Sequence, residues 1–222
     1  MSSAANPNTV PVNAHPVVLQ VLPLLETGEI ERNAVDVAVF LKRAGGTPIV
    51  VSEGGRLVHE LERNGILHIT LPVRSESFLT IRANSRALAQ LIRQHGVDIV
   101  HARSRAGAWS AFFAARRTGA AFLTTHHQAY PFSSGLRKLY NSVMARGDRV
   151  IAISNFIADH LGATYGTNPS RSRTIPRGID LYKFNPDTVT AERMASLTHE
   201  WRLNDGQKVI LCPSRLDHGK GQ

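Results

Sequence analysis

Apolar residues recur along the chain in two alternating patterns, one typical of buried strands and one typical of amphipathic helices. The run 17–22 is almost continuously apolar, and in residues 30–41 the apolar positions return with a period near 3.6. The predicted strands are residues 17–22, 47–52, 66–71, 97–101, 120–125, 149–153 and 173–175, and the predicted helices are residues 30–41, 56–64, 78–95, 106–118, 136–146 and 155–165. This alternation predicts an α/β fold, a doubly wound, Rossmann-like parallel sheet covered on both faces.

The regular alternation ends near Asp180, which predicts a domain boundary. Residues 187–206 have the polar, turn-rich composition of a linker with a short helix, and residues 208–212 begin a new strand. One strand and a loop cannot form a domain, so we expect only the start of a second, truncated domain. The expected divisions are a disordered lead at 1–16, an N-terminal domain at 17–186, the linker at 187–206, and the first strand and loop of the second domain at 207–222.

The composition of the chain limits the classes of protein to which it can belong. An apolar content of 42% over 222 residues supports a packed core. The 26 Lys and Arg residues against 17 Asp and Glu give a formal charge of +9, which favours anionic partners. The single cysteine, Cys212, excludes an internal disulfide, and no Cys/His spacing resembles a zinc site. No stretch is apolar enough to span a membrane and the lead does not resemble a signal peptide, so we expect a soluble protein, and the single cysteine fits a reducing cytoplasm.

The loop between the first strand and the first helix, residues 22–32, is a candidate anion site. Ligands of parallel sheets bind beyond the carboxyl ends of the strands, and the N–H groups at a helix start attract anions, although a simple connection fits equally well. Only Gly28 is present where a dinucleotide site needs three glycines, and Glu29 and Glu31 would repel a pyrophosphate. Both carboxylates suit the helix dipole, and for Glu31 a direct role is equally open.

Two later loops carry basic and imidazole side chains. Arg103 and Arg105 follow the fourth strand, and they either reach a phosphate or carboxylate together or lie in solvent. His126 and His127 follow the fifth strand, where a histidine can donate a proton, hydrogen-bond a sugar hydroxyl or tether the loop. No acidic triad partner is nearby, so nucleophilic catalysis is not supported.

The last loop carries the features of a diphosphate clamp. Arg215 provides a planar fork, Lys220 provides a point charge, and Gly219 and Gly221 allow close approach. The spacing is not that of a P-loop, which needs Gly, four residues and then Gly-Lys-Ser/Thr.

Taken together, these segments resemble the family 4 glycosyltransferases, which are retaining enzymes with two Rossmann-like domains in the GT-B arrangement. The segments that carry the resemblance are residues 22–32, 101–109, 124–127, 152–157, 175–184 and 214–222. The resemblance is closest to bacterial members that build cell-envelope polysaccharide or lipopolysaccharide. The chain departs from the family pattern at Gly28-Glu29, where Gly-Gly is usual, and at Ser214-Arg215, where Gly-Arg is usual.

The resemblance implies roles for particular residues. Arg215 and Lys220 would hold the donor diphosphate in place of a metal, and His127 would lie near the donor sugar. The loops with Gly28 and Glu31, and with Arg103 and Arg105, would lie near the acceptor or a phosphate. No cofactor is implied. Sugar transfer would occur on the front face, with the donor phosphate assisting deprotonation of the acceptor.

The resemblance also implies the partners, which are a nucleotide-sugar donor and a glycan or lipid-linked acceptor, with no nucleic acid. Residues 130–140 mix aromatics with Arg137 and Lys138, so peripheral contact with an anionic membrane at its inner face is open, beside ordinary helix packing. The paired glutamates that grip the donor in this family are absent, so we expect little transfer by these 222 residues alone. The alternatives are a non-catalytic anion- or glycan-binding module and a pseudoenzyme fragment.

Overall fold

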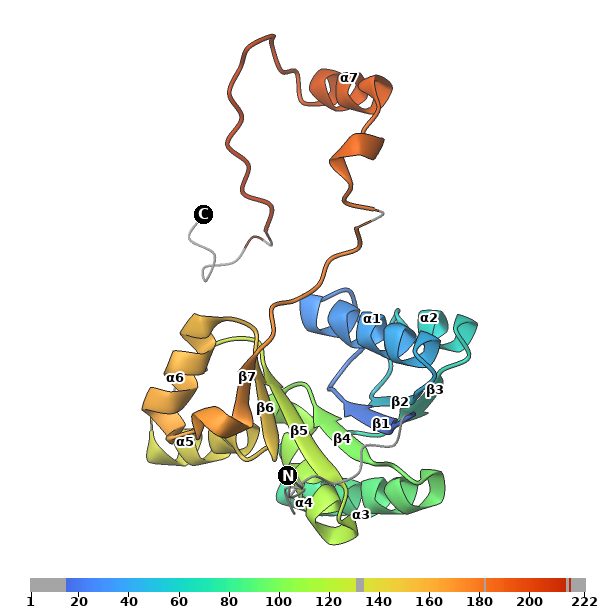
Figure 1. Ribbon diagram of the computed structural model, residues 1–222, viewed down its shortest axis with the longest axis vertical. Helices are drawn as coiled ribbons and strands as arrows, with labels where there is room; N and C mark the ends of the chain where they lie inside the picture. Colours follow the sequence, from blue (N-terminus) through green and yellow to red (C-terminus); the bar gives the residue numbers. More distant parts are fainter. Residues whose placement is uncertain (1–14, 131–133, 182, 215, 217–222) are drawn as a thin grey trace, which may run out of the picture. The chain divides into compact units, whose positions relative to one another are not determined.

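A computed structural model describes residues 15–130, 134–181, 183–214 and 216 of the chain. The chain divides into two compact units, Met1–Gly178 and Ile179–Gln222. In the first unit, seven parallel strands form one sheet in the order β3-β2-β1-β4-β5-β6-β7 (Figure 1). The strands are β1 (Val17–Val21), β2 (Thr47–Ser52), β3 (Leu67–Thr70), β4 (Ile99–Ala102), β5 (Ala121–His126), β6 (Arg149–Ala152) and β7 (Ser172–Thr174).

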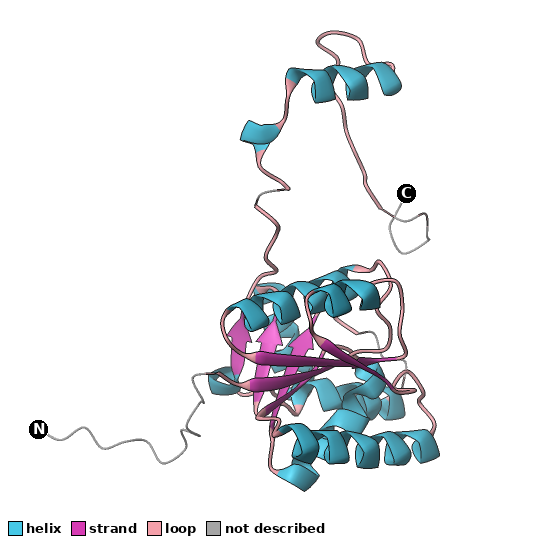
Figure 2. Cartoon of the chain, turned by 90° about the vertical axis from the view of Figure 1, so that its right-hand side faces the viewer, coloured by secondary structure: helices cyan, strands magenta, loops and turns pink. Residues whose placement is uncertain are grey.

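Helices lie on both sides of this sheet (Figure 2). The helices of the first unit are α1 (Glu29–Arg43), α2 (Val58–Arg63), α3 (Phe78–His95), α4 (Arg105–Thr118), α5 (Gly135–Asn141), α6 (Asn155–Tyr165) and the 3-10 helices η1 (Ser142–Ala145) and η2 (Pro169–Arg171). The predicted α/β class is confirmed, and the predicted strands of this unit all form, with ends shifted by no more than a few residues. The helix predicted over residues 136–146 is divided into α5 and η1.

The second unit contains two short helical segments. They are the 3-10 helix η3 (Pro186–Thr188) and α7 (Ala191–Glu200), and α7 is the short helix expected within the linker. The strand predicted over residues 208–212 does not form. A strand needs a hydrogen-bonded neighbour, and the described residues provide none there. The first unit ends at Gly178, before the expected domain end at residue 186.

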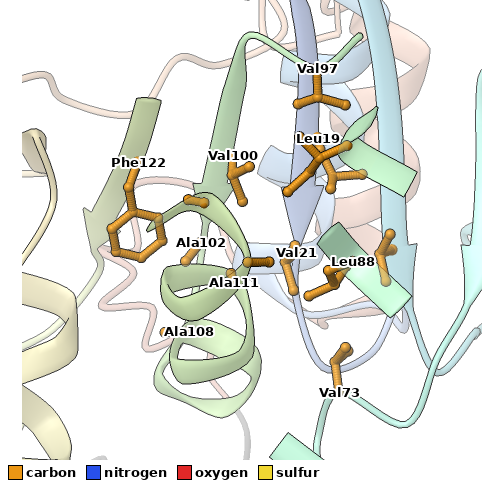
Figure 3. Packing of buried hydrophobic residues seen from close by; sticks show 14 of the residues in the cluster. Leu19, Val21, Val73, Leu88, Val97, Val100, Ala102, Ala108, Ala111 and Phe122 are labelled. Carbon is orange, nitrogen blue, oxygen red and sulfur yellow. The ribbon is translucent and has the colours of Figure 1, made fainter. Parts of the chain in front are cut away.

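The main core lies between the sheet and the layer formed by α3 and α4. Because side chains alternate along a strand, Leu19 and Val21 of β1 point to this layer, and in the sheet register Leu19 lies beside Val100 of β4. Phe122 of β5 and Leu88 of α3 join the same cluster (Figure 3). This burial fixes the register of the central strands and therefore the positions of the loops that follow them.

The opposite face of the sheet is covered over only one half. Helices α1 and α2 pack there through Ala34, Ala38 and Leu61 against Val50 of β2. Over β4, β5 and β6 the apolar side chains line a cavity of about 380 Å³ instead. Helices thus lie on both faces of the sheet as predicted, and among the described residues they leave this half of one face open. Helices α4 and α6, which follow β4 in the chain, pack on the other face, against Val100 of β4 and Val150 of β6.

The loop between β1 and α1 is held against the loop that follows β2. The amide of Leu25 donates to the carbonyl of Gly54 at 2.8 Å, and the amide of Leu57 donates to the carbonyl of Leu25 at 2.7 Å. Gly55 has a φ of +138°, and a Cβ atom there would lie 2.5 Å from the backbone carbon of Leu25. The backbones of Leu25 and Gly55 cannot move apart without breaking these hydrogen bonds between the loops. The contact therefore requires glycine at position 55.

Replacing Gly55 with alanine is expected to destabilise the protein more than replacing Gly54. Both glycines have positive φ, but a Cβ atom at Gly54 would meet nothing within 4 Å. Each substitution has a conformational cost of about 1–3 kcal/mol, and Gly55→Ala adds an overpacking cost of about 1–3 kcal/mol. Urea unfolding of the two variants provides the comparison. Equal losses would show that the loop–loop contact is not rigid.

Candidate functional site

Polar side chains gather at the carboxyl ends of adjacent strands, on the half of the sheet that α1 and α2 leave open. Gln20 of β1 lies in register with His101 of β4, and the Nε2 atom of His101 lies 2.7 Å from the Oγ1 atom of Thr125 in β5. The cavity of about 380 Å³ reaches this edge, where Asn33, His101, Arg103, Thr125 and Arg177 line it. We call these five residues the polar end of the cavity.

Arg103 is the most deeply buried cation of this site. Its side chain follows β4 directly, and the residue is only 2% exposed. Its Nη1 atom donates to Oε1 of Gln20 at 3.1 Å and its Nη2 atom donates to Oδ1 of Asn33. Gln20 is held in turn by a 3.0 Å hydrogen bond to the carbonyl of Ala34. Burial, together with the nearby Arg177, lowers the pKa of Arg103 to about 10, so the guanidinium remains charged at neutral pH.

Arg177 brings a second cation to the polar end from the loop after β7. Its Nη1 atom lies 2.5 Å from Oε2 of Glu29, in the first turn of α1. The Glu29 side chain is 82% exposed and that of Arg177 is 26% exposed, so the ion pair lies on the solvent side of the guanidinium. Glu29 therefore ties the loop after β7 to the start of α1, a role beyond the helix-dipole role expected from sequence.

The structure does not bring Arg105 to the same point as Arg103. The Nη1 atom of Arg105 donates to Oδ1 of Asn141 at 3.0 Å, and its guanidinium carbon lies 4.4 Å from the centre of the Tyr130 ring. The chain turns into α4 at Ser104, so the side chains on either side of it reach different elements. The expectation that both arginines reach one anion therefore does not hold in this arrangement.

His127 is buried beside the two cations. It is 7% exposed, and neither ring nitrogen has a hydrogen-bond partner among the described residues. Burial lowers the pKa of His127 to about 3, with smaller contributions from Arg103 and Arg177. His126 is also buried, with its ring 5.6 Å from that of Tyr130, and burial lowers its pKa to about 4. Both imidazoles are therefore neutral at pH 7, which suits hydrogen bonding better than proton donation.

Acid is expected to destabilise the protein through these histidines. Burial also holds the pKa of His101 well below its usual value. Below the ordinary histidine value of about 6.5 the unfolded chain binds protons that the folded chain does not, down to the folded values of about 4 for His126 and about 3 for His127. Stability should therefore fall with pH below about 6.5, by up to about 1.4 kcal/mol per pH unit for each such histidine.

Urea unfolding between pH 7.5 and 4.5 measures this slope. His127→Gln should reduce the slope by about one proton. The carboxylates contribute equally to the pH slope of the wild type and of the variant, so their contribution cancels when the two slopes are compared. Identical slopes for His127→Gln and the wild type would contradict the burial of a neutral imidazole.

The first loop is not shaped as a phosphate cradle. Gly28 has a φ of −74° and a ψ of 165°, an extended conformation that any residue adopts. The three atoms nearest to a Cβ atom there would all belong to the Glu31 carboxylate, so the Glu31 side chain lies over Gly28 at the start of α1. A negative charge thus stands where a phosphate would have to bind, in agreement with the exclusion of a dinucleotide site.

Several residues of the site were not among those predicted from sequence. Gln20 and Asn33 hold Arg103, and Arg177 is the second cation. Gln20 had a readable signal, because a polar residue inside the apolar run 17–22 must find a partner when the strand is buried. The predicted diphosphate residues Arg215 and Lys220 lie outside the described residues. In the described part of the chain no group of three His, Cys, Asp or Glu residues could hold a metal, and no helix is long and apolar enough to cross a membrane.

Comparison with known proteins identifies the family. Residues 30–183 match the family model described as Glycosyltransferase Family 4. The chain belongs to this family. The matched range contains the polar end of the cavity and His127, and it includes β2 to β7.

Two solved structures and one further protein are similar to this chain. A crystal structure of a glycosyltransferase from Rickettsia africae has a TM-score of 0.82 and 38% identity, with 94% of this chain covering 55% of that chain. The Anabaena protein HepE, in complex with UDP and glucose, has a TM-score of 0.66 at 15% identity, with coverage of 84% and 50%. Alpha-monoglucosyldiacylglycerol synthase of Streptococcus pneumoniae is 28% identical over 156 residues, which are 63% of this chain and 34% of that protein. The chain thus spans about half, or less, of the length of these relatives.

Proposed function

We propose that the complete protein transfers a sugar from a nucleotide-sugar donor to a glycan or lipid-linked acceptor, with retention of the anomeric configuration. The observation that carries this proposal is the family match over residues 30–183, a range that includes the polar end of the cavity. HepE was crystallised with UDP and glucose, which supports a nucleotide-sugar donor. The name of the pneumococcal relative describes the synthesis of a glucosylated diacylglycerol, which supports a lipid-linked acceptor.

The residues have separate roles in the proposed reaction. The bond between sugar C1 and the donor phosphate oxygen breaks, and the acceptor hydroxyl oxygen forms the new bond to C1 on the same face. The acceptor proton passes to the departing phosphate oxygen. Arg215 and Lys220 hold the diphosphate and neutralise its developing charge. His127, buried and neutral, hydrogen-bonds the donor sugar, and the loops with Gly28, Glu31 and Arg103 lie on the acceptor side.

In this proposal residues 17–186 form the acceptor domain and residues 207–222 begin the donor domain. The lengths of the relatives support it, since the chain covers 55% of the Rickettsia protein. Because the diphosphate clamp needs the whole donor domain to position it, the 222 residues alone should transfer little sugar.

The proposed setting is the synthesis of bacterial cell-envelope polysaccharide or lipopolysaccharide at the inner membrane face. Leu136 and Leu139 of α5 are 81% and 54% exposed, and Arg137 and Lys138 lie between them. Exposed leucines beside basic residues suit an anionic lipid surface, although α5 is short. This arrangement supports a lipid-linked acceptor over a freely diffusing one.

A panel of UDP-, GDP- and ADP-sugars, tested with the complete protein and a lipid extract from a bacterial envelope, examines the proposal. We expect one nucleotide class to release nucleoside diphosphate only when the acceptor extract is present. A protein that binds polyanions with steep salt dependence and has no preference among the nucleotide sugars would instead be the non-catalytic module.

A further inference from the structure

The inner nitrogen atoms of two arginines in the cavity lack hydrogen-bond acceptors. The Nε atoms of Arg103 and Arg177 are both buried, and neither has a partner among the residues that the structure describes. Both residues line the polar end of the same cavity. Buried donors are satisfied in the great majority of cases, so two unsatisfied donors on residues that line one cavity indicate that a molecule outside this chain supplies the acceptor.

The charge of the site indicates what kind of acceptor this is. Arg103 is 2% exposed and its protein partners, Gln20 and Asn33, are neutral amides. Glu29 pairs with Arg177 from the solvent side, through Nη1. A bound water would satisfy an Nε–H group but would leave the charge of Arg103 uncompensated, whereas an anion satisfies both needs.

We propose that Arg103 and Arg177 bind a carboxylate or phosphate ester on the acceptor, so that this enzyme takes an acidic acceptor. The inference rests on the proposed function and names the class of acceptor at the same site. Guanidinium groups bind planar carboxylates and phosphates through paired N–H donors. The apolar neighbours Ile153, Ile175 and Pro176 line the same cavity and would strengthen the charge interaction by excluding water.

The acceptor, rather than the donor, is the substrate assigned to these arginines. In the proposed reaction the donor diphosphate is already bound by Arg215 and Lys220. An anion at Arg103 is therefore a second negative group, held by the acceptor domain. It would orient the acceptor through a charge-assisted contact away from the bond that forms.

The first test uses the wild-type complete protein with UDP present and ionic strength held constant. Titration calorimetry compares glucuronate, which carries a carboxylate, glucose 6-phosphate, which carries a phosphate ester, and neutral glucose. We expect at least one of the acidic sugars to bind at least ~10-fold more tightly than glucose, as a charge-assisted contact implies. Glucose binding as tightly as both acidic sugars would overturn the inference.

The second test uses variants matched for charge. Arg103→Met and Arg177→Met should each weaken binding of the preferred acidic sugar by about 10- to 100-fold. Arg103→Lys keeps the positive charge but lacks the planar guanidinium group, so it should retain only part of the wild-type affinity. Arg117→Met removes the same charge from an exposed position in α4 and should have no effect. If circular dichroism shows that Arg103→Met is unfolded, Arg177→Met is decisive. Unchanged acidic-sugar binding in a folded variant would overturn the inference.

UDP binding, measured in the same samples, separates this inference from the proposed function. A protein that binds UDP but has no preference for acidic sugars would contradict the acidic acceptor alone. A protein that binds an acidic sugar through Arg103 but binds no nucleotide would support the anion site and contradict the sugar-transfer function.

Discussion

His127→Ala is expected to lower kcat/KM for sugar transfer by the complete protein by about 100-fold or more. The imidazole is buried, neutral and without a hydrogen-bond partner in the described part of the chain, so its bonding capacity is available to a substrate. A hydrogen bond that strengthens in the transition state accounts for a rate factor of this size. His127→Gln, which keeps a neutral donor and acceptor, should retain more activity than His127→Ala.

The pH profile distinguishes a hydrogen-bonding His127 from an acid catalyst. Because its pKa is lowered to about 3, the imidazole stays neutral from pH 5 to pH 8. The rates of the wild type and of His127→Gln should therefore depend on pH in the same way over this range. A wild-type profile that falls above pH 6.5, and becomes flat in the variant, would assign proton donation to His127. Equal rates for the wild type and His127→Ala would remove it from the site.

Lys220→Ala is expected to abolish most transfer, with a loss of about 100- to 1,000-fold in kcat. The reason is that the lysine would neutralise the diphosphate as it departs, and removal of one such contact commonly costs 2–3 orders of magnitude. In the proposed clamp, the flanking Gly219 and Gly221 would allow the phosphate to approach closely. Initial rates at saturating donor measure the effect directly.

Lys208→Ala is the matched control for Lys220→Ala. Lys208 is an exposed lysine of the same chain segment and is not part of the proposed clamp, so its removal should leave the rate within about two-fold of the wild type. Unchanged turnover in Lys220→Ala would contradict the diphosphate clamp. A similar loss in both variants would attribute the effect to the overall charge of the segment.

The sheet and helices of the first unit were predictable because each has a strong local signal. Largely apolar runs of four to six residues form β1 to β6, and the 3.6-residue period of residues 78–95 predicts α3 with the observed bounds. Residues 208–212 carry the same strand signal yet form no strand, because pairing depends on a neighbour and not on local composition alone. The open half of the sheet face was not predictable for a related reason, since sequence periodicity does not say which face each helix covers.

The candidate site was only partly predictable. Loop positions after the strands located His127 and Arg103 correctly at the sheet edge, because the carboxyl ends of parallel strands meet there. The partners of each side chain depend on tertiary contacts. The start of α4 directs Arg105 to Tyr130, and Arg177 reaches the cavity from the loop after β7, about 70 residues further along the chain.

The anomeric configuration of the product tests the central claim most directly. The complete protein is incubated with a labelled α-linked nucleotide sugar and acceptor, and NMR follows the anomeric proton of the labelled sugar. We expect label on the acceptor in equal amount to the nucleoside diphosphate released, with the α configuration retained and the signal lost in Lys220→Ala. A β-linked product would contradict retention, and the absence of labelled product with every nucleotide sugar of the panel would contradict sugar transfer itself.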